Sequence, residues 1–253
     1  MKYSLIKQES KDKIKGKRLR ALSVILFGLI FCAVITALSF GAIFVSELFG
    51  GSSIAVTLIC AAVSVLFCVI SVLVYSSVSV GEKAWYGGIT ADKKNYRKRL
   101  YFWFKPKNSF RALRFCALLA SVKLMWAAVF LLPSAIVLWS IYYLSGTGGL
   151  ELYLFLSLSG GFVLLFISGL IFFFISVQRY FLSEYLFSSN PRLGAWTAIK
   201  QSKNLLDGHI HEIVRFKLSF LPWFFGCALI VPAFYFIPYY KESCCMVAKK
   251  ITL

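Results

Sequence analysis

The chain has 253 residues, of which 59% are hydrophobic and 15% are charged, and its 28 basic and 10 acidic side chains give a net charge of +18. Soluble domains are roughly 45–50% apolar and about 25% charged, so this composition excludes an ordinary soluble domain. It also excludes a disordered, collagen-like or disulfide-scaffold chain. The charges lie almost entirely outside a few long apolar blocks, as in a polytopic membrane protein.

Five charge-free stretches reach the roughly 20 residues that a helix needs to cross a bilayer core about 30 Å thick. Their bounds are Ala21–Val45, Ile54–Val80, Leu124–Leu144, Leu152–Val177 and Leu218–Tyr239. Lipid offers no partners for open backbone groups, so each stretch is predicted to be a helix. Short turns, 46–53 and 145–151, join the first four into two hairpins. The predicted fold class is an all-α polytopic membrane bundle of about five transmembrane helices, forming a single membrane domain.

The positions of the basic residues predict the orientation. Eight lie in segment 1–20, ten lie in connection 81–123 before its last residue, six lie in connection 178–217, and none lies in the hairpin turns. By the positive-inside rule, the amino terminus and both connections are predicted to be cytoplasmic. The first apolar run continues to Val45, longer than the 7–15 residues of a cleaved signal peptide, so we expect it to remain as a span.

The fifth stretch leaves two possibilities open. It contains Pro222, Pro232 and Pro238, which can kink a helix or fold it back as a re-entrant hairpin. A kinked full crossing, which we favour, would place the basic tail 240–253 outside. A re-entrant hairpin would return the tail to the cytoplasm.

Lys123 is the one charge that could lie inside the membrane. A lysine buried at a helix centre costs about 2.5–3.5 kcal/mol and suggests an ion pathway. No acidic residue occurs in any of the five stretches, so Lys123 has no partner there. We therefore interpret Lys123 as the cytoplasmic end of its span, with residues 110–122 along the membrane surface.

Small, weakly polar residues share one face of the second span. They are Thr57, Cys60, Ser64, Cys68, Ser71 and Tyr75. The first span has Ala33, Ala37 and Gly41 at the same spacing. Small residues let helices pack closely, which is the plainer interpretation of both faces. The alternative is that the second span lines a polar pathway.

The connection after the second span is the most basic segment, and aromatic residues 101–104 follow its charges. Basic residues interleaved with aromatic ones can bind nucleic acid. Beside a membrane, however, each Lys or Arg attracts anionic headgroups by about 1 kcal/mol, and Trp and Tyr anchor at the interface. We therefore predict contacts with anionic lipid and none with nucleic acid. The predicted contact residues are Lys93, Lys94, Arg97, Lys98 and Arg99.

The second connection is predicted to contain a helix. Asn190 is a good N-cap, Pro191 suits the first helical position, and Gly208 fits the residue just past the end. We expect this helix to lie on the membrane surface or against the underside of the bundle.

Few residues suggest chemistry. His209, His211 and Glu212 follow this helix, but their spacing is poor for a metal site and no third distant ligand is evident. None of the seven cysteines forms a C-x-x-C pair, and adjacent Cys244 and Cys245 are expected to pack rather than to be acylated or oxidised. No nucleophile elbow, Walker loop or dinucleotide fingerprint occurs. We predict no catalytic, cofactor or metal site.

Short motifs occur in one order along most of the chain. They are Lys7, Ser10-Lys11 and Ile14-Lys15-Gly16; Leu124-Met125-Trp126 and Leu132-Pro133; Ser202-Lys203, Leu206 and Gly208-His209; and Leu218-Ser219-Phe220, Trp223 and Pro238-Tyr239. Together they resemble an uncharacterised bacterial membrane family, domain of unknown function 975. The chain departs from the family pattern at Ser134, usually glycine, and at Cys244–Val247, where Phe-Tyr is expected. The resemblance implies a bacterial plasma-membrane protein and brings no activity with it.

These features predict a non-enzymatic accessory or assembly component of a membrane complex, without a cofactor. Its expected partners are anionic lipid headgroups and either another membrane protein or a second copy of the chain. A self-contained permease or channel for a small solute is the alternative, with the second-span face and the proline-rich fifth stretch lining the path. A lipid-modifying enzyme is a third class, and it would need His209, His211 or Glu212 in catalysis.

Overall fold

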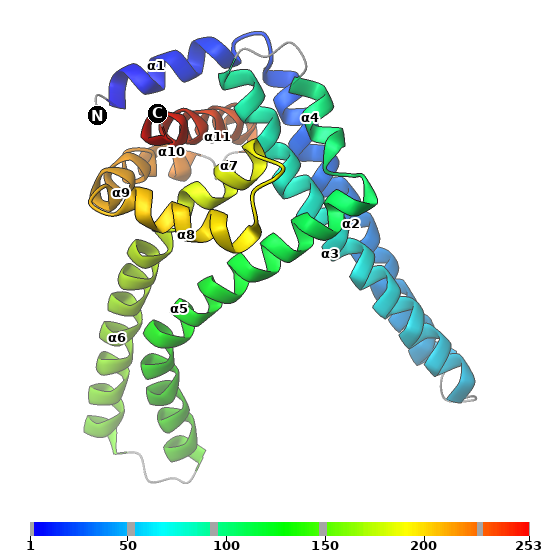
Figure 1. Cartoon of the computed structure of the whole chain (residues 1–253). Helices are drawn as coiled ribbons and strands as arrows, with labels where there is room; N and C mark the ends of the chain where they lie inside the picture. Colours follow the sequence, from blue (N-terminus) through cyan, green and yellow to red (C-terminus); the bar gives the residue numbers. More distant parts are fainter. Residues whose placement is uncertain (1–2, 50–53, 92–95, 147–150, 227–229, 253) are drawn as a thin grey trace.

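A computed structural model describes residues 3–49, 54–91, 96–146, 151–226 and 230–252, and in these residues it contains helices and turns but no strand (Figure 1). The helices are α1 (Tyr3–Ile14), α2 (Arg18–Phe49), α3 (Ile54–Thr90), α4 (Tyr96–Phe102), α5 (Pro106–Gly146), α6 (Leu152–Gln178), α7 (Phe181–Ser189), α8 (Ala195–Leu206), α9 (Ile210–Leu218), α10 (Leu221–Gly226) and α11 (Ile230–Thr252). The all-α prediction is confirmed.

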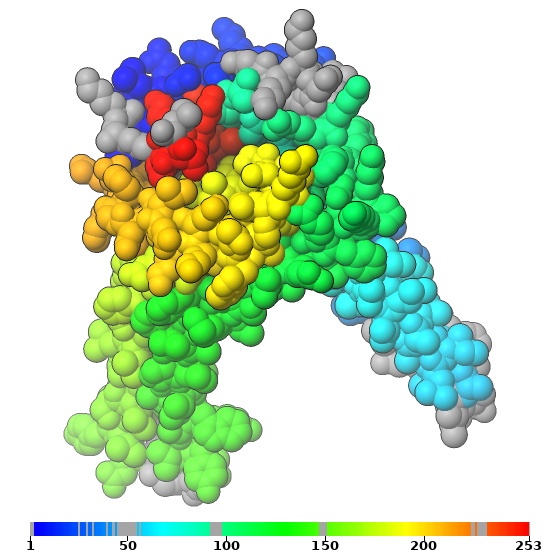
Figure 2. Space-filling view, in the orientation of Figure 1, coloured from blue at the N-terminus to red at the C-terminus, as the bar shows by residue number. Residues whose placement is uncertain are grey.

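Four helical runs in the described residues are long and apolar enough to cross a membrane: α2, α3, α5 and the run that begins with α6. The first four predicted spans lie within these helices. α2 packs against α3 and α5 against α6, and the two hairpins diverge like legs from a common cap (Figures 1 and 2). Residues 50–53 and 147–150 of the two predicted turns lie outside the described residues, whereas 46–49 still belong to α2 and 145–146 to α5.

In each hairpin a glycine lets the two helices approach closely. A Cβ atom added to Gly28 of α2 would lie 2.7 Å from Cγ1 of Val78 on α3. A Cβ atom added to Gly169 of α6 would lie 2.5 Å from the carbonyl oxygen of Phe130 on α5. Lipid tails are as apolar as the helices, so such close packing is the main source of helix association in a membrane.

The cap consists of α1, α4 with the following Trp103, α7 to α11, and the parts of α3 and α5 nearest to them. Its core is aromatic: the rings of Phe115 and Phe187 stack with centroids 4.3 Å apart, and Trp103 lies 5.2 Å from Phe187. Residues 110–122, expected along the membrane surface, instead belong to the first part of α5 and bury Phe115 and Leu119 in this core. The cap is therefore a packed protein core and not a set of loose connections.

The stretch Leu218–Tyr239, predicted as a fifth full crossing, is not among the four runs that are long and apolar enough to cross a membrane in the described residues. α9 ends at Leu218, and α11 begins only at Ile230. Pro222 has no N–H to donate to the carbonyl of Leu218, which favours the break between α9 and α10. α11 then packs against α1, with residues 242–248 buried, and both chain ends lie on the cap (Figure 1). α1 and α11 therefore lie at the same end of the molecule, an arrangement that the re-entrant alternative also predicts.

The helix predicted to begin at Asn190 begins later. Asn190 ends α7, and its Oδ1 accepts a hydrogen bond from the Arg192 backbone N–H at 3.2 Å. Its side chain therefore closes a turn, and α8 begins at Ala195 with Gly194 as the N-cap. Gly208, with φ +87°, lies just past the helix end as predicted, in the left-handed region that glycine favours. α8 packs against α5 and α7.

Candidate functional site

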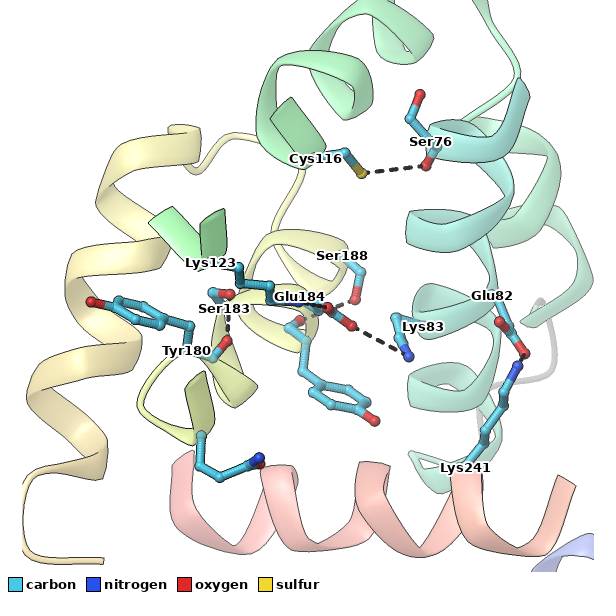
Figure 3. A network of polar contacts seen from close by, with 12 residues as sticks. Ser76, Glu82, Lys83, Cys116, Lys123, Tyr180, Ser183, Glu184, Ser188 and Lys241 are labelled. Atoms are coloured by element: carbon cyan, nitrogen blue, oxygen red, sulfur yellow. Dashed lines mark hydrogen bonds and ion pairs between the residues drawn. The ribbon is translucent and has the colours of Figure 1, made fainter. Parts of the chain in front are cut away.

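A carboxylate in the cap joins the two hairpins. Glu184 lies on α7, with Oε2 3.3 Å from Nζ of Lys83 on α3 and Oε1 3.5 Å from Nζ of Lys123 on α5 (Figure 3). The three side chains are 19–37% exposed, so water screens these ion pairs only in part. Because the two lysines belong to different hairpins, the triad holds both hairpins against the cap.

Lys123 therefore has an acidic partner, which the sequence analysis did not find. Glu184 lies 61 positions away, outside every predicted span. The contact places Lys123 beside the cap, and its interpretation as the cytoplasmic end of its span stays a prediction. Glu184 is the only charged residue of α7, whose sequence is FLSEYLFSS. A single acid in an otherwise uncharged helix was the available signal, because such a group needs a cationic partner when it is partly buried.

A cavity of about 200 Å³, here called the basic cavity, lies beside this triad. It is partly open and is lined by residues of α3, α5, α6, α7, α9 and α11. Its charged lining groups are Lys83, Lys123, Glu184, Lys217 and Lys241. The ammonium group of Lys241 forms an ion pair with Glu82, 2.5 Å away, so its charge is already compensated (Figure 3).

Lys217 is the lysine of the basic cavity whose partners are uncharged. Its Nζ donates a hydrogen bond to Oε1 of Gln178 and lies 4.2 Å from the ring centroid of Phe181. In the part of the chain that the structure describes, no carboxylate lies within 4.0 Å of this Nζ. Burial lowers the pKa of Lys217; Cys244 and Glu184 oppose the shift, and the positive charges of Lys83 and Lys123 reinforce it.

The adjacent cysteines lie inside the cap. Cys244 and Cys245 are both buried free thiols, and Sγ of Cys245 lies 3.3 Å from Oγ1 of Thr90. Burial raises the pKa of Cys244, and it raises the pKa of Cys245 to about 12. Acylation and thiol exchange need the thiolate, which these surroundings disfavour. Their positions agree with the packing interpretation.

The predicted lipid-contact residues are described only in part. Lys93, Lys94 and the side chain of Arg97 lie outside the described residues. Lys98 is exposed. Arg99 is half-buried and lines a second cavity of about 220 Å³, together with residues of α3, α7 and α11. The headgroup contacts thus stay a prediction.

The weakly polar face of α3 is unevenly buried. Thr57 and Tyr75 are exposed, whereas Ser64 and Ser71 are half-buried. The hydroxyl of Ser64 donates a hydrogen bond to the carbonyl oxygen of Cys60, one turn earlier in the same helix. A hydroxyl bonded within its own helix offers less to a permeating solute.

The histidines of the second connection lie at the surface. Nδ1 of His209 is 4.0 Å from Oε1 of Glu212, and these side chains are 55% and 41% exposed. His211 is also exposed. Among the described residues, no group of three or more His, Cys, Asp or Glu side chains is placed to hold a metal ion.

Comparisons with known proteins identify the family but no function. No curated protein and no solved structure matches the chain. One family model, described as "Protein of unknown function (DUF975)", matches residues 1–252, which confirms the resemblance found in the short motifs. Because this match covers almost the whole chain, the chain belongs to this uncharacterised family.

Proposed function

We propose that the protein is a non-enzymatic accessory or assembly component of a complex in the bacterial plasma membrane, with its cap and both termini in the cytoplasm. The positive-inside rule supports this orientation, because the basic residues gather in the terminal segment and connections that build the cap. The hairpin turns at the opposite end contain none.

The divergence of the two hairpins is the observation that carries the proposal. Figure 2 shows them as separate legs below the cap. In the most apolar 18-residue part of each of the four membrane-suited helical runs, at most 13% of the residues are buried inside the protein. A helix inside a self-contained bundle buries a continuous apolar stripe against its neighbours. The hairpins therefore leave most of their surface to lipid or to helices of another protein.

One exposed face of α2 suits a close helix contact. Ala33, Ala37 and Gly41 are exposed and lie four residues apart. A Cβ atom added to Gly41 would meet nothing within 4 Å. Small residues at this spacing let a second helix approach closely, which is how membrane helices associate. We assign this face to a helix of a membrane-protein partner.

The test is purification of the tagged protein from its native membrane in a mild detergent, with the mass and polypeptide composition determined. We expect a second protein in stoichiometric amount. Ala37→Trp should remove it, because the indole blocks close approach on an exposed face. Leu38→Trp, at a position that is 49% exposed and already large, is the matched control. A single polypeptide species, or equal loss in both variants, contradicts the proposal.

A homo-oligomer would instead favour the permease or channel. Flux assays in liposomes would then compare the native chain with Ser64→Leu and Ser71→Leu. Loss of a flux with assembly intact would support a pathway, and loss of assembly would support packing. A normal phenotype in the triple alanine variant of His209, His211 and Glu212 would exclude the lipid-modifying enzyme.

A further inference from the structure

We propose that the basic cavity binds an anionic phosphate group, supplied either by a lipid headgroup at the membrane surface or by free phosphate. This inference goes beyond the proposed function and does not depend on any protein partner.

The charge of the basic cavity points to an anion. Lys241 is compensated by Glu82, which leaves Lys83, Lys123 and Lys217 with the one carboxylate of Glu184. Three ammonium groups and one carboxylate give a local excess of two positive charges. Excess charge in a partly enclosed space is unfavourable unless a counter-charge is bound. A phosphate group supplies that counter-charge.

The geometry leaves Lys217 available for the ligand. Its contacts with Gln178 and Phe181 orient the ammonium group without neutralising it. Lys83 and Lys123 reach the same cavity from two other helices. Phosphate oxygens accept charge-assisted hydrogen bonds from several ammonium groups at once. The volume of about 200 Å³ is several times the roughly 30 Å³ that one water occupies, so a phosphate group fits.

The basic cavity also lies at the boundary between the apolar helices and the cap. Gln178, which lines it, is the last residue of α6. Close by, Nε1 of Trp126 donates a hydrogen bond to the hydroxyl of Tyr180, also a lining residue. Trp and Tyr are enriched where the membrane meets water, which is the level of phospholipid phosphates.

The experiment measures thermal unfolding of the full-length protein in an uncharged detergent. One arm adds inorganic phosphate, and the other adds phosphatidylglycerol, with zwitterionic phosphatidylcholine as its control. A ligand that binds only the folded state raises the unfolding temperature with concentration. A shift with inorganic phosphate identifies free phosphate as a ligand, and a shift with phosphatidylglycerol alone identifies the headgroup.

Three variants locate the site. Lys217→Met should weaken binding about ten-fold or more, because a hydrogen bond to a charged group is lost. Removing an uncompensated cation should leave the fold intact. Lys200→Met, at an exposed position of α8, should change nothing. Glu184→Gln should strengthen binding, because it raises the excess charge by one. Each variant is compared with its own ligand-free unfolding temperature.

The pH dependence supplies a second readout. Lys217 must be protonated to bind an anion, and its pKa is lowered from the ordinary 10.5. Binding should therefore weaken as the pH rises through this lowered value, before surface lysines lose their protons, and Lys217→Met should abolish that step. The polar and titratable side chains that line the cavity around Lys217 are Lys83, Lys123, Gln178, Tyr180, Glu184, Tyr185, Tyr240, Lys241 and Cys244. No shift in either arm, or equal shifts in Lys217→Met and Lys200→Met, would overturn the proposal.

Discussion

Replacing Gly169 by alanine tests the contact that holds the second hairpin together. The added Cβ would lie 2.5 Å from the carbonyl oxygen of Phe130 and 3.3 Å from its carbon. Both atoms belong to the backbone of α5, so no side-chain rotation can relieve the overlap. α6 must move away from α5, and the contacts on either side of the glycine loosen. Gly160→Ala, in the same helix, is the matched control, because a Cβ there meets nothing within 4 Å.

The two substitutions separate the steric cost from helix propensity. Alanine is favoured over glycine in a helix interior by about 1 kcal/mol, and both variants gain this amount. Forcing extra atoms into a well-packed contact costs about 1–3 kcal/mol. The overlap at Gly169 is with backbone, which favours the upper part of that range. We expect Gly169→Ala to be less stable than Gly160→Ala by about 1–3 kcal/mol.

The measurement is reversible unfolding in mixed micelles with increasing fractions of a denaturing detergent. Two cysteines introduced on facing positions of α5 and α6 can be crosslinked only while the two helices are close, so the crosslink shows whether the hairpin itself has opened. The reasoning is refuted if the two alanine variants unfold at the same detergent fraction, because the close approach at Gly169 would then not contribute to stability.

Three further outcomes can be measured in the same assay or by thiol labelling. Phe187→Ala should lower the free energy of unfolding by about 3–5 kcal/mol, because a stacked core ring is removed. Trp196→Ala, at a position that is 61% exposed, should change it by no more than about 0.5 kcal/mol. Equal effects of the two substitutions would contradict an aromatic cap core. Glu184→Gln should lower the free energy of unfolding by about 1–3 kcal/mol, because it leaves two lysines unpaired. Glu9→Gln, which removes an exposed ion pair with Lys250 at 3.9 Å, should lower it by less than about 1 kcal/mol. The reverse order would show that the triad does not hold the hairpins. Burial raises the pKa of Cys245 to about 12. In a variant that keeps only this cysteine, a water-soluble maleimide should therefore react slowly with the folded protein and quickly after denaturation. Rapid labelling of the folded protein would show that the thiol is accessible.

The local sequence pattern was enough to predict most of the long helices. The first four apolar stretches appear as α2, α3, α5 and α6, because a long charge-free run has few alternatives to a helix in lipid. Gly208 ends its helix as predicted, since glycine takes the left-handed conformation without strain. Asn190 was misjudged because an asparagine side chain can cap a helix or close a turn, and neighbouring residues do not decide between the two.

The ion pairs of the cap and the packing of its helices depend on contacts between residues that are far apart in the sequence. Composition and the placement of charge identify a membrane protein, because span length and charge placement are local properties. The family was indicated separately, by the resemblance of the short motifs, and the family-model match confirms it. They could not pair Glu184 with Lys83 and Lys123, which approach only when α3, α5 and α7 pack together. The fifth apolar stretch was as apolar as a span, yet it is split, and α11 is buried against α1. Whether an apolar stretch meets lipid or protein depends on which partner surface is available, and only the packed molecule contains that surface.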